Sequence, residues 1–133
     1  MIIVDTSAWI EEIRGTGSMV DLKLVDLQER RAAIAVTEPV VMELLAGARS
    51  NRELIDTRRR MLAFPMVRVG GLDAYERAAV VWRSCHVAGE TVRTTLDCLI
   101  AAVAIREGAS ILHKDRDFDV IARHTPLRIE PVR

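Results

Sequence analysis

The first seven residues, MIIVDTS, constrain the fold more than any other stretch of the chain. Four apolar, partly β-branched residues in a row predict a strand buried on both faces, because an exposed face would show polar alternation. A carboxylate, two hydroxyls and a helical run over 8–13 follow at once. In open parallel sheets ligands bind at the carboxyl ends of the strands, so Asp5 would stand at that edge. The alternative is that Asp5 only caps the helix, since Asp, Thr and Ser all cap well.

Short apolar runs alternate with helical segments along the rest of the chain. Further strands are predicted at 32–36, 66–69, 110–113 and 127–129, and further helices at 18–30, 37–48, 52–62, 73–87, 94–107 and 117–123. This alternation implies crossover connections and a parallel sheet covered by helices on both sides. We therefore expect an α/β protein, a three-layer α/β/α sandwich with a four- to five-stranded, mainly parallel sheet. The length of 133 residues predicts a single domain over 1–133.

The composition limits the classes of protein that remain. Half of the residues are hydrophobic and 29% are charged, which is typical of a soluble globular protein and not of extended disorder. No apolar run approaches the roughly 18 residues of a membrane span, and no basic segment precedes the first apolar stretch as in a signal peptide. We expect a cytoplasmic protein without a membrane partner. Cys85 and Cys98 lack a metal-binding spacing and are expected to be core thiols.

Three further acids, Glu43, Asp97 and Asp115, stand next to apolar segments or at the ends of predicted strands and helices. Glu43 is the only charged residue within 40–46, at a helical position that should pack against the rest of the protein. The alternative is that Glu43 lies at the rim of the helix with its carboxylate in solvent. Asp97 stands three residues after Thr94, so a capping box is its alternative interpretation. Asp115 directly follows a predicted strand and could simply belong to a strand-to-helix turn.

The joint geometry favours a shared site. Asp5 and Asp115 would each lie just past the end of a strand, whereas Asp97 and Glu43 lie near helix N-termini, which meet the same sheet edge. Four carboxylates would converge there, with Asp117 close by. Without a cation they would repel one another strongly and some would be protonated. Oxygen-only ligation without histidine or thiolate suits Mg²⁺ or Mn²⁺.

The charge balance is compatible with a polyanionic substrate. The chain has 19 basic and 19 acidic side chains, so setting aside five pocket acids leaves 14 acids against 19 bases. The remaining surface would then carry an excess of five positive charges. Arg93, Lys114 and Arg116 flank the acids and could meet phosphates, or could be solvated surface charges.

These residues resemble a known family, the PIN-domain ribonucleases, and within it the toxin (VapC-like) halves of VapBC toxin–antitoxin pairs. The resemblance covers nearly the whole chain. It rests on the order and spacing of four segments: VDTS at 4–7, Glu43 in its apolar helix, DCLIAA at 97–102 and HKDRDF at 113–118.

The resemblance implies metal-assisted hydrolysis of RNA phosphodiester bonds in tRNA, rRNA or mRNA, which blocks translation. The matching catalytic acids are Asp5, Glu43, Asp97 and Asp115. Asp5, Asp97 and Asp115 would hold Mg²⁺ or Mn²⁺ directly, and Glu43 would act through water. Asp117 matches an auxiliary metal-binding acid, carried over less firmly, and Ser7 matches a hydroxyl that supports the first aspartate.

The resemblance also implies a partner, a cognate VapB-like antitoxin whose C-terminal segment wraps the toxin and can place a basic side chain against the acids. A homodimer or a toxin–antitoxin hetero-oligomer is expected. Two alternatives stay open, a PIN domain that binds RNA or a partner without catalysis, and a phosphoacceptor receiver domain. The receiver would need a second acid beside Asp5 and a phosphorylatable Asp after a central strand, and the segments at 35–37 and 67–70 offer neither.

Overall fold

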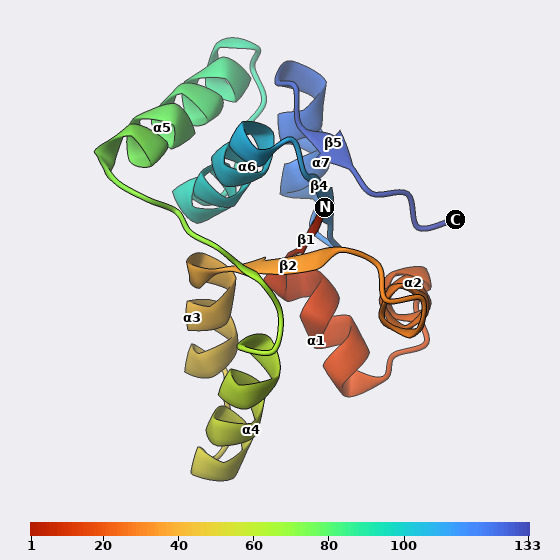
Figure 1. The fold of residues 1–133 in the computed structure, drawn as a ribbon. Helices are drawn as coiled ribbons and strands as arrows, with labels where there is room; N and C mark the ends of the chain where they lie inside the picture. The colour runs from red at the N-terminus through yellow and green to blue at the C-terminus, as the bar shows by residue number, and fades with distance from the viewer.

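A five-stranded parallel sheet forms the centre of the molecule (Figure 1). The structure is a computed structural model that describes residues 1–133. The strands are β1 (Ile2–Val4), β2 (Ile34–Thr37), β3 (Met66–Val67), β4 (Ser110–Leu112) and β5 (Arg128–Ile129). Their order is β3-β2-β1-β4-β5, and every neighbouring pair is parallel. The predicted α/β class and parallel sheet are confirmed.

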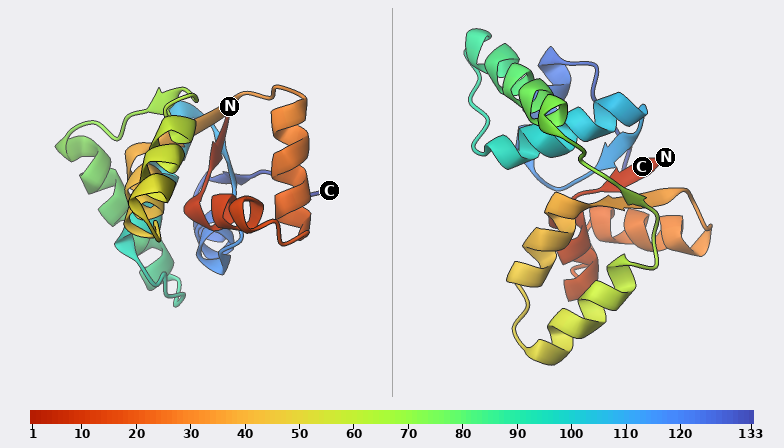
Figure 2. Two further views of the ribbon diagram at one scale, coloured as in Figure 1. Left: turned by 90° about the horizontal axis from the view of Figure 1, so that it is seen from below. Right: turned by 60° about the vertical axis from the view of Figure 1, so that its left-hand side comes forward.

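Seven helices cover the two faces of this sheet. They are α1 (Thr6–Arg14), α2 (Met19–Glu29), α3 (Glu38–Ala46), α4 (Asn51–Met61), α5 (Leu72–Val87), α6 (Thr95–Glu107) and α7 (Arg116–His124). Figure 2 shows that α1–α4, coloured red to yellow-green, lie on one side of the sheet and α5–α7 on the other. This division gives the expected three layers. None of the helices is both long enough and apolar enough to cross a bilayer.

The chain reverses its direction of travel across the sheet at β1. It moves outward from β1 through β2 to β3, and α5 and α6 then carry it back to β4 on the other side of β1. Ile3 accordingly pairs with Ala35 of β2 and with Ile111 of β4. Such a reversal leaves a crevice at the carboxyl ends of the two strands, where α/β proteins bind ligands.

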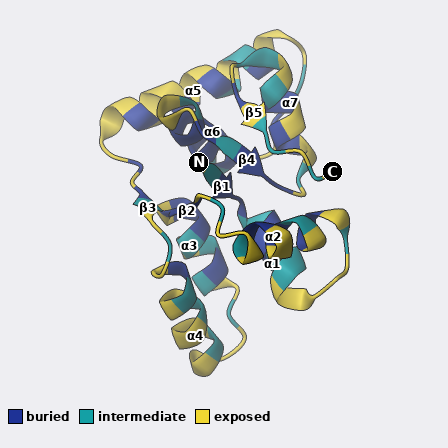
Figure 3. Ribbon diagram, turned by 45° about the vertical axis from the view of Figure 1, so that its right-hand side comes forward, coloured by how far each residue is buried: buried dark blue, intermediate teal, exposed yellow.

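The core lies between the sheet and its helices. β1 and β4 contribute fully buried apolar residues, as their continuous hydrophobic sequences predict. α6 is buried along most of its length, from Asp97 to Ala104, because it packs between the sheet and α5. Figure 3 shows the contrast with α4 and α5, whose outward faces are largely exposed.

The end of β3 differs from the strand predicted at 66–69. β3 ends at Val67 and not at Val69, because the Val69 N–H donates to the Glu38 carboxylate and its carbonyl accepts from Arg106 in place of a strand partner. The cap of α4 is Ser50, whose Oγ accepts from the Glu53 N–H at 3.1 Å. Thr37 stands at the cap position of α3 but makes no side-chain capping bond.

Candidate metal centre

Three aspartates gather at the carboxyl edge of the sheet. Asp97 lies in the first turn of α6, Asp115 caps α7, and Asp117 lies in the first turn of α7. One carboxylate oxygen from each lies within 4.8 Å of the other two. We call these three residues the aspartate triad. Oxygens at this spacing can share one divalent cation, because Mg²⁺ and Mn²⁺ prefer carboxylate ligands.

Asp97 is the least satisfied member of the triad. It is only 6% exposed, and its Oδ2 makes no hydrogen bond. Its burial, followed by the negative charges of Asp5, Asp115 and Asp117, raises the pKa of Asp97 to about 8. Thr94 caps α6 through its own hydroxyl, which accepts from the Leu96 N–H at 3.0 Å. A buried carboxylate oxygen without a partner among other carboxylates is the arrangement that a bound cation would stabilise.

Asp5 lies beside the aspartate triad but is not one of the three acids whose oxygens lie within 4.8 Å of one another. It caps α1 by accepting from the Ser7 N–H at 3.0 Å, and the Ser7 hydroxyl donates to the same Oδ2 at 2.6 Å. That hydroxyl also accepts from the Lys114 N–H at 2.9 Å, so Ser7 links the ends of β1 and β4. Burial raises the pKa of Asp5 although both Ser7 bonds oppose the shift. The capping and site interpretations of Asp5 are therefore compatible.

Glu43 approaches the same rim from α3. The Thr6 hydroxyl donates to its Oε1 at 2.8 Å and fixes the orientation of the carboxylate. Partial burial raises the pKa of Glu43, the Thr6 bond opposes this, and the charges of Asp5 and Asp115 add to the increase. Sequence reasoning missed Thr6, although its position between Asp5 and Ser7 is a signal that a second hydroxyl faces the acids.

Arg93 contacts two members of the triad. Its Nη2 donates to Asp115 Oδ1 at 2.6 Å, its Nε lies 3.3 Å from Asp117 Oδ2, and its backbone N–H donates to the same oxygen at 3.1 Å. These carboxylates hold the pKa of the Arg93 guanidinium above its ordinary value. Lys114, by contrast, directs its ammonium group to Glu11 at 2.7 Å. Of the basic residues that flank the acids, Arg93 therefore has the direct contacts.

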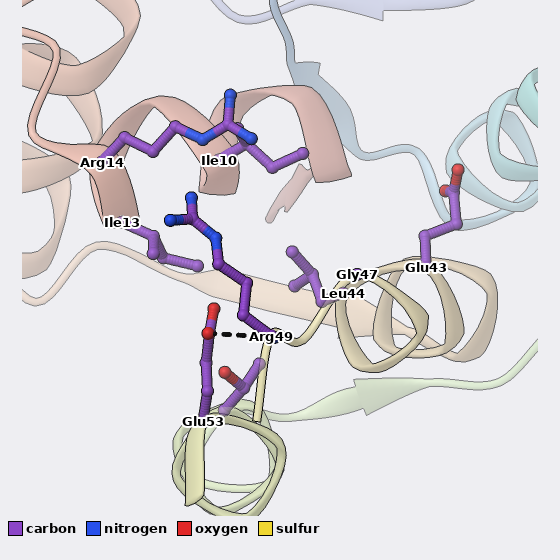
Figure 4. Close-up of a pocket in the computed structure, with 9 residues that line it drawn as sticks. Ile10, Ile13, Arg14, Glu43, Leu44, Gly47, Arg49 and Glu53 are labelled. Carbon is purple, nitrogen blue, oxygen red and sulfur yellow. Dashed lines mark hydrogen bonds between the residues drawn. The ribbon is translucent and has the colours of Figure 1, made fainter. Parts of the chain in front are cut away.

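A cavity of about 120 Å³ opens beside Glu43, between α1 and the α3–α4 pair (Figure 4). Its apolar lining comes from Ile10, Ile13 and Leu44. Figure 4 shows that Arg49 extends its guanidinium group from the α3–α4 connection toward α1, whereas Arg14 runs along α1 with its guanidinium group near Ile10. The cavity thus joins an apolar floor and two cations to the acidic edge.

All of the predicted site residues lie at this edge of the sheet, but not at equal distances. The structure brings Asp97, Asp115 and Asp117 together most closely, and Asp5 and Glu43 flank them. Asp117, which the sequence supported less firmly, is the most buried acid, 1% exposed. The resemblance supports Asp117 less firmly because its counterpart in the family is less regularly a ligand, and its role in metal binding stays a prediction.

Comparison with known proteins identifies the family of the chain. The PIN domain profile matches residues 2–124, and the chain belongs to the PIN-domain family. It is 45% identical to ribonuclease VapC11 of Mycobacterium tuberculosis over 134 residues, which cover the whole of both chains.

Two solved structures share the fold at lower sequence identity. VapBC2 from Rickettsia felis, bound to a DNA fragment from its promoter, superposes with a TM-score of 0.75 at 18% identity, over 98% of both chains. VapC20 of Mycobacterium tuberculosis, a toxin that cleaves the Sarcin-Ricin loop, superposes with a TM-score of 0.68 at 22% identity, over 96% of this chain and 99% of that one.

Proposed function

We propose that this protein is a metal-dependent endoribonuclease and the toxin of a toxin–antitoxin pair. The observation that carries the proposal is the aspartate triad, with one buried carboxylate oxygen of Asp97 left without a hydrogen-bond donor. The name of a relative with 45% identity over the whole chain, ribonuclease VapC11, supports the same activity.

The triad suits Mg²⁺ or Mn²⁺. Three aspartate oxygens within 4.8 Å of one another, without histidine or thiolate, form a hard ligand set. When bound, such a cation would neutralise charge on a phosphoryl group and make a nearby water more acidic. Asp97, Asp115 and Asp117 would hold it, and Asp5, oriented by Ser7, would complete the anionic edge.

Glu43 is suited to accept a proton from the attacking water. Thr6 occupies its Oε1, which leaves Oε2 to receive the proton. Partial burial and the neighbouring acids raise the pKa of Glu43, which makes the carboxylate a better base near neutral pH. Arg93 and Arg116 lie on the solvent side, where the phosphates of an RNA strand would arrive.

The proposed partner is a VapB-like antitoxin. The proposed substrate is an RNA of the translation machinery, whether tRNA, rRNA or mRNA, and the proposed location is the cytoplasm. The Rickettsia felis VapC-type fold was solved as a VapBC assembly, and VapC20 cleaves the Sarcin-Ricin loop. In this chain, the cavity beside Glu43 would take an apolar segment of the partner, because Ile10, Ile13 and Leu44 line it together with two arginines and two glutamates.

Cleavage of RNA by the purified, partner-free protein tests the proposal. Total bacterial RNA would be incubated with the protein in Mg²⁺, Mn²⁺ or EDTA, and the cut ends would be mapped. We expect cleavage with either cation and none in EDTA. The Asp97→Asn variant should lose at least about a hundredfold in rate, because it removes one charged ligand.

Asp73→Asn is the matched control, since Asp73 occupies the first turn of α5 as Asp97 occupies that of α6. It should cleave like the parent protein. Cleavage that persists in EDTA, or in the Asp97→Asn variant, would contradict the proposed mechanism. Binding of RNA without any cleavage would favour the non-catalytic alternative.

A further inference from the structure

Arg93 is anchored through its backbone and exposed to solvent at its guanidinium group. Its backbone N–H donates to Asp117 Oδ2 at 3.1 Å, and the next residue, Thr94, caps the helix that carries Asp97. The Cα of Arg93 therefore has a fixed position beside the aspartate triad. Its side chain is nevertheless 66% exposed, so the guanidinium lies at the solvent boundary.

The guanidinium occupies oxygens that a metal ion would need. It donates to Asp115 Oδ1 at 2.6 Å and lies 3.3 Å from Asp117 Oδ2, and both residues belong to the triad. A divalent cation on these carboxylates would take over their negative charge and repel the guanidinium. Only the guanidinium side of these pairs is exposed, at 66%, so this cation can move into solvent when a stronger competitor binds the carboxylates.

The guanidinium group of Arg93 lies on the solvent-accessible side of the triad. The side chain of Asp117 is 2% exposed and Asp97 is also buried, whereas the side chain of Asp115 is 23% exposed. A cavity of about 390 Å³ adjoins the guanidinium, and its polar lining comes from Glu90, Thr91, Arg93, Arg116 and the triad member Asp117. A phosphodiester that reaches the triad would therefore pass the guanidinium, whose planar donor group matches phosphate oxygens.

We propose that Arg93 exchanges partners during the reaction cycle: it pairs with Asp115 and Asp117 when no metal is bound, and it positions an RNA phosphate when metal occupies the triad. This inference rests on the proposed metal-dependent cleavage of RNA. It makes Arg93 a positioning residue that couples the two binding events, because metal binding releases the group that RNA then uses.

The first test measures metal binding without RNA. Titration calorimetry with Mn²⁺ would compare the parent protein with Arg93→Gln, Arg93→Lys and the control Arg30→Gln. Arg30, the C-cap residue of α2, forms an exposed pair with Asp26 of the same helix at 2.8 Å, away from the triad. We expect Mn²⁺ to bind several-fold more tightly to Arg93→Gln, since a competing cation is gone, and equally to Arg30→Gln.

The second test measures RNA recognition with a labelled oligonucleotide that carries the site cut by the parent protein in total bacterial RNA. In Mn²⁺, Arg93→Gln should raise KM at least about fivefold. The slope of log(kcat/KM) against log(salt concentration) should become shallower by about 0.7, the value for the loss of one phosphate contact on a single strand. In EDTA, the same substitution should change RNA affinity by less than about twofold, because Arg93 is then paired with the aspartates.

Arg93→Lys keeps the charge and should retain the salt slope, which provides a readout if Arg93→Gln folds poorly. Weaker Mn²⁺ binding in Arg93→Gln would overturn the inference, since Arg93 would then support the triad and not compete with metal. Unchanged Mn²⁺ affinity together with unchanged KM would also overturn it, and would leave the proposed nuclease intact. Absence of Mn²⁺-dependent cleavage by the parent protein would overturn both.

Discussion

Asp5 and Asp115 each use one carboxylate for two purposes. Asp5 accepts from the Ser7 N–H and caps α1, and Asp115 accepts from the Asp117 N–H at 3.0 Å and caps α7. A cap holds the carboxylate within the first turn of the helix, where the helix dipole favours a negative charge. In this protein the same restraint aims both acids at one edge of the sheet. Capping thus explains how short side chains on loops reach defined positions.

Substitution of Ser7 should show how much the activity depends on the orientation of Asp5, because Ser7 itself is not proposed to bind the metal. Ser7→Ala removes the donor to Asp5 and leaves the Lys114 N–H without its acceptor. We expect a loss of about 1 kcal/mol in the free energy of unfolding, measured by urea denaturation, and a fall of roughly tenfold in cleavage rate. Ser7→Thr should retain most of the activity. Ser84→Ala, which removes a hydroxyl bonded to the Val80 carbonyl on α5, should leave cleavage unchanged.

Asp97 should make the metal-free protein less stable as pH rises. Burial raises its pKa in the folded state from 3.8 to about 8, so the folded state binds more protons than the unfolded state between those values. The stability contribution is therefore full below about pH 4 and is lost as pH rises through about 8. Melting temperatures of metal-free protein should fall by several degrees between about pH 5 and pH 8.5. Asp97→Asn should flatten this slope, and an unchanged slope would contradict the assignment.

At the scale of elements, α6 links the core to the site. Its N-terminal turn carries Asp97 at the sheet edge, and its body is buried through Ala104. Small residues let α6 lie close to α5, the helix with which it has the most extensive contact. Gly108 then ends α6 with φ near +64°, a conformation that glycine adopts without strain. The position of Asp97 therefore depends on the packing of the whole helix.

Overpacking α6 tests this dependence. Ala101 is fully buried, so Ala101→Leu must displace neighbouring core atoms, and we expect it to destabilise the protein by about 1–3 kcal/mol. Ala79→Leu on the exposed face of α5 is the control and should change stability by less than about 0.5 kcal/mol. Chemical denaturation would measure both. Equal stabilities for the two variants would show that α6 is loosely packed.

At the scale of the whole molecule, the reversal of the chain at β1 creates the acidic edge. β1 and β4 are neighbours in the sheet although about a hundred residues separate them, and Ser7 bridges their ends through the Lys114 N–H. α3 brings Glu43 to the same edge from one face of the sheet, and α6 brings Asp97 from the other. Folding therefore gathers like charges, which opposes stability until a cation binds.

Metal binding should consequently raise the stability of the whole fold. A cation that binds only the folded state adds RT ln(1 + [L]/Kd), about 2.7 kcal/mol at a concentration of 100 Kd. We expect Mn²⁺ to raise the melting temperature in a concentration-dependent way and EDTA to reverse the change. Asp97→Asn should reduce the increase, whereas Asp73→Asn should preserve it. A melting temperature that is insensitive to Mn²⁺ would contradict a metal site in the triad.

The sequence by itself determined the alternation of buried strands and helices, the parallel sheet and the edge at which the acids lie. Those features follow from local patterns, because apolar runs, caps and acids after strands act over a few residues. Only the tertiary structure decided that Asp117 joins Asp97 and Asp115 more closely than Asp5 does, and that Arg93 pairs with two of them. Distances between side chains depend on the rotation of each helix and on loop closure, which are set by packing across the whole core.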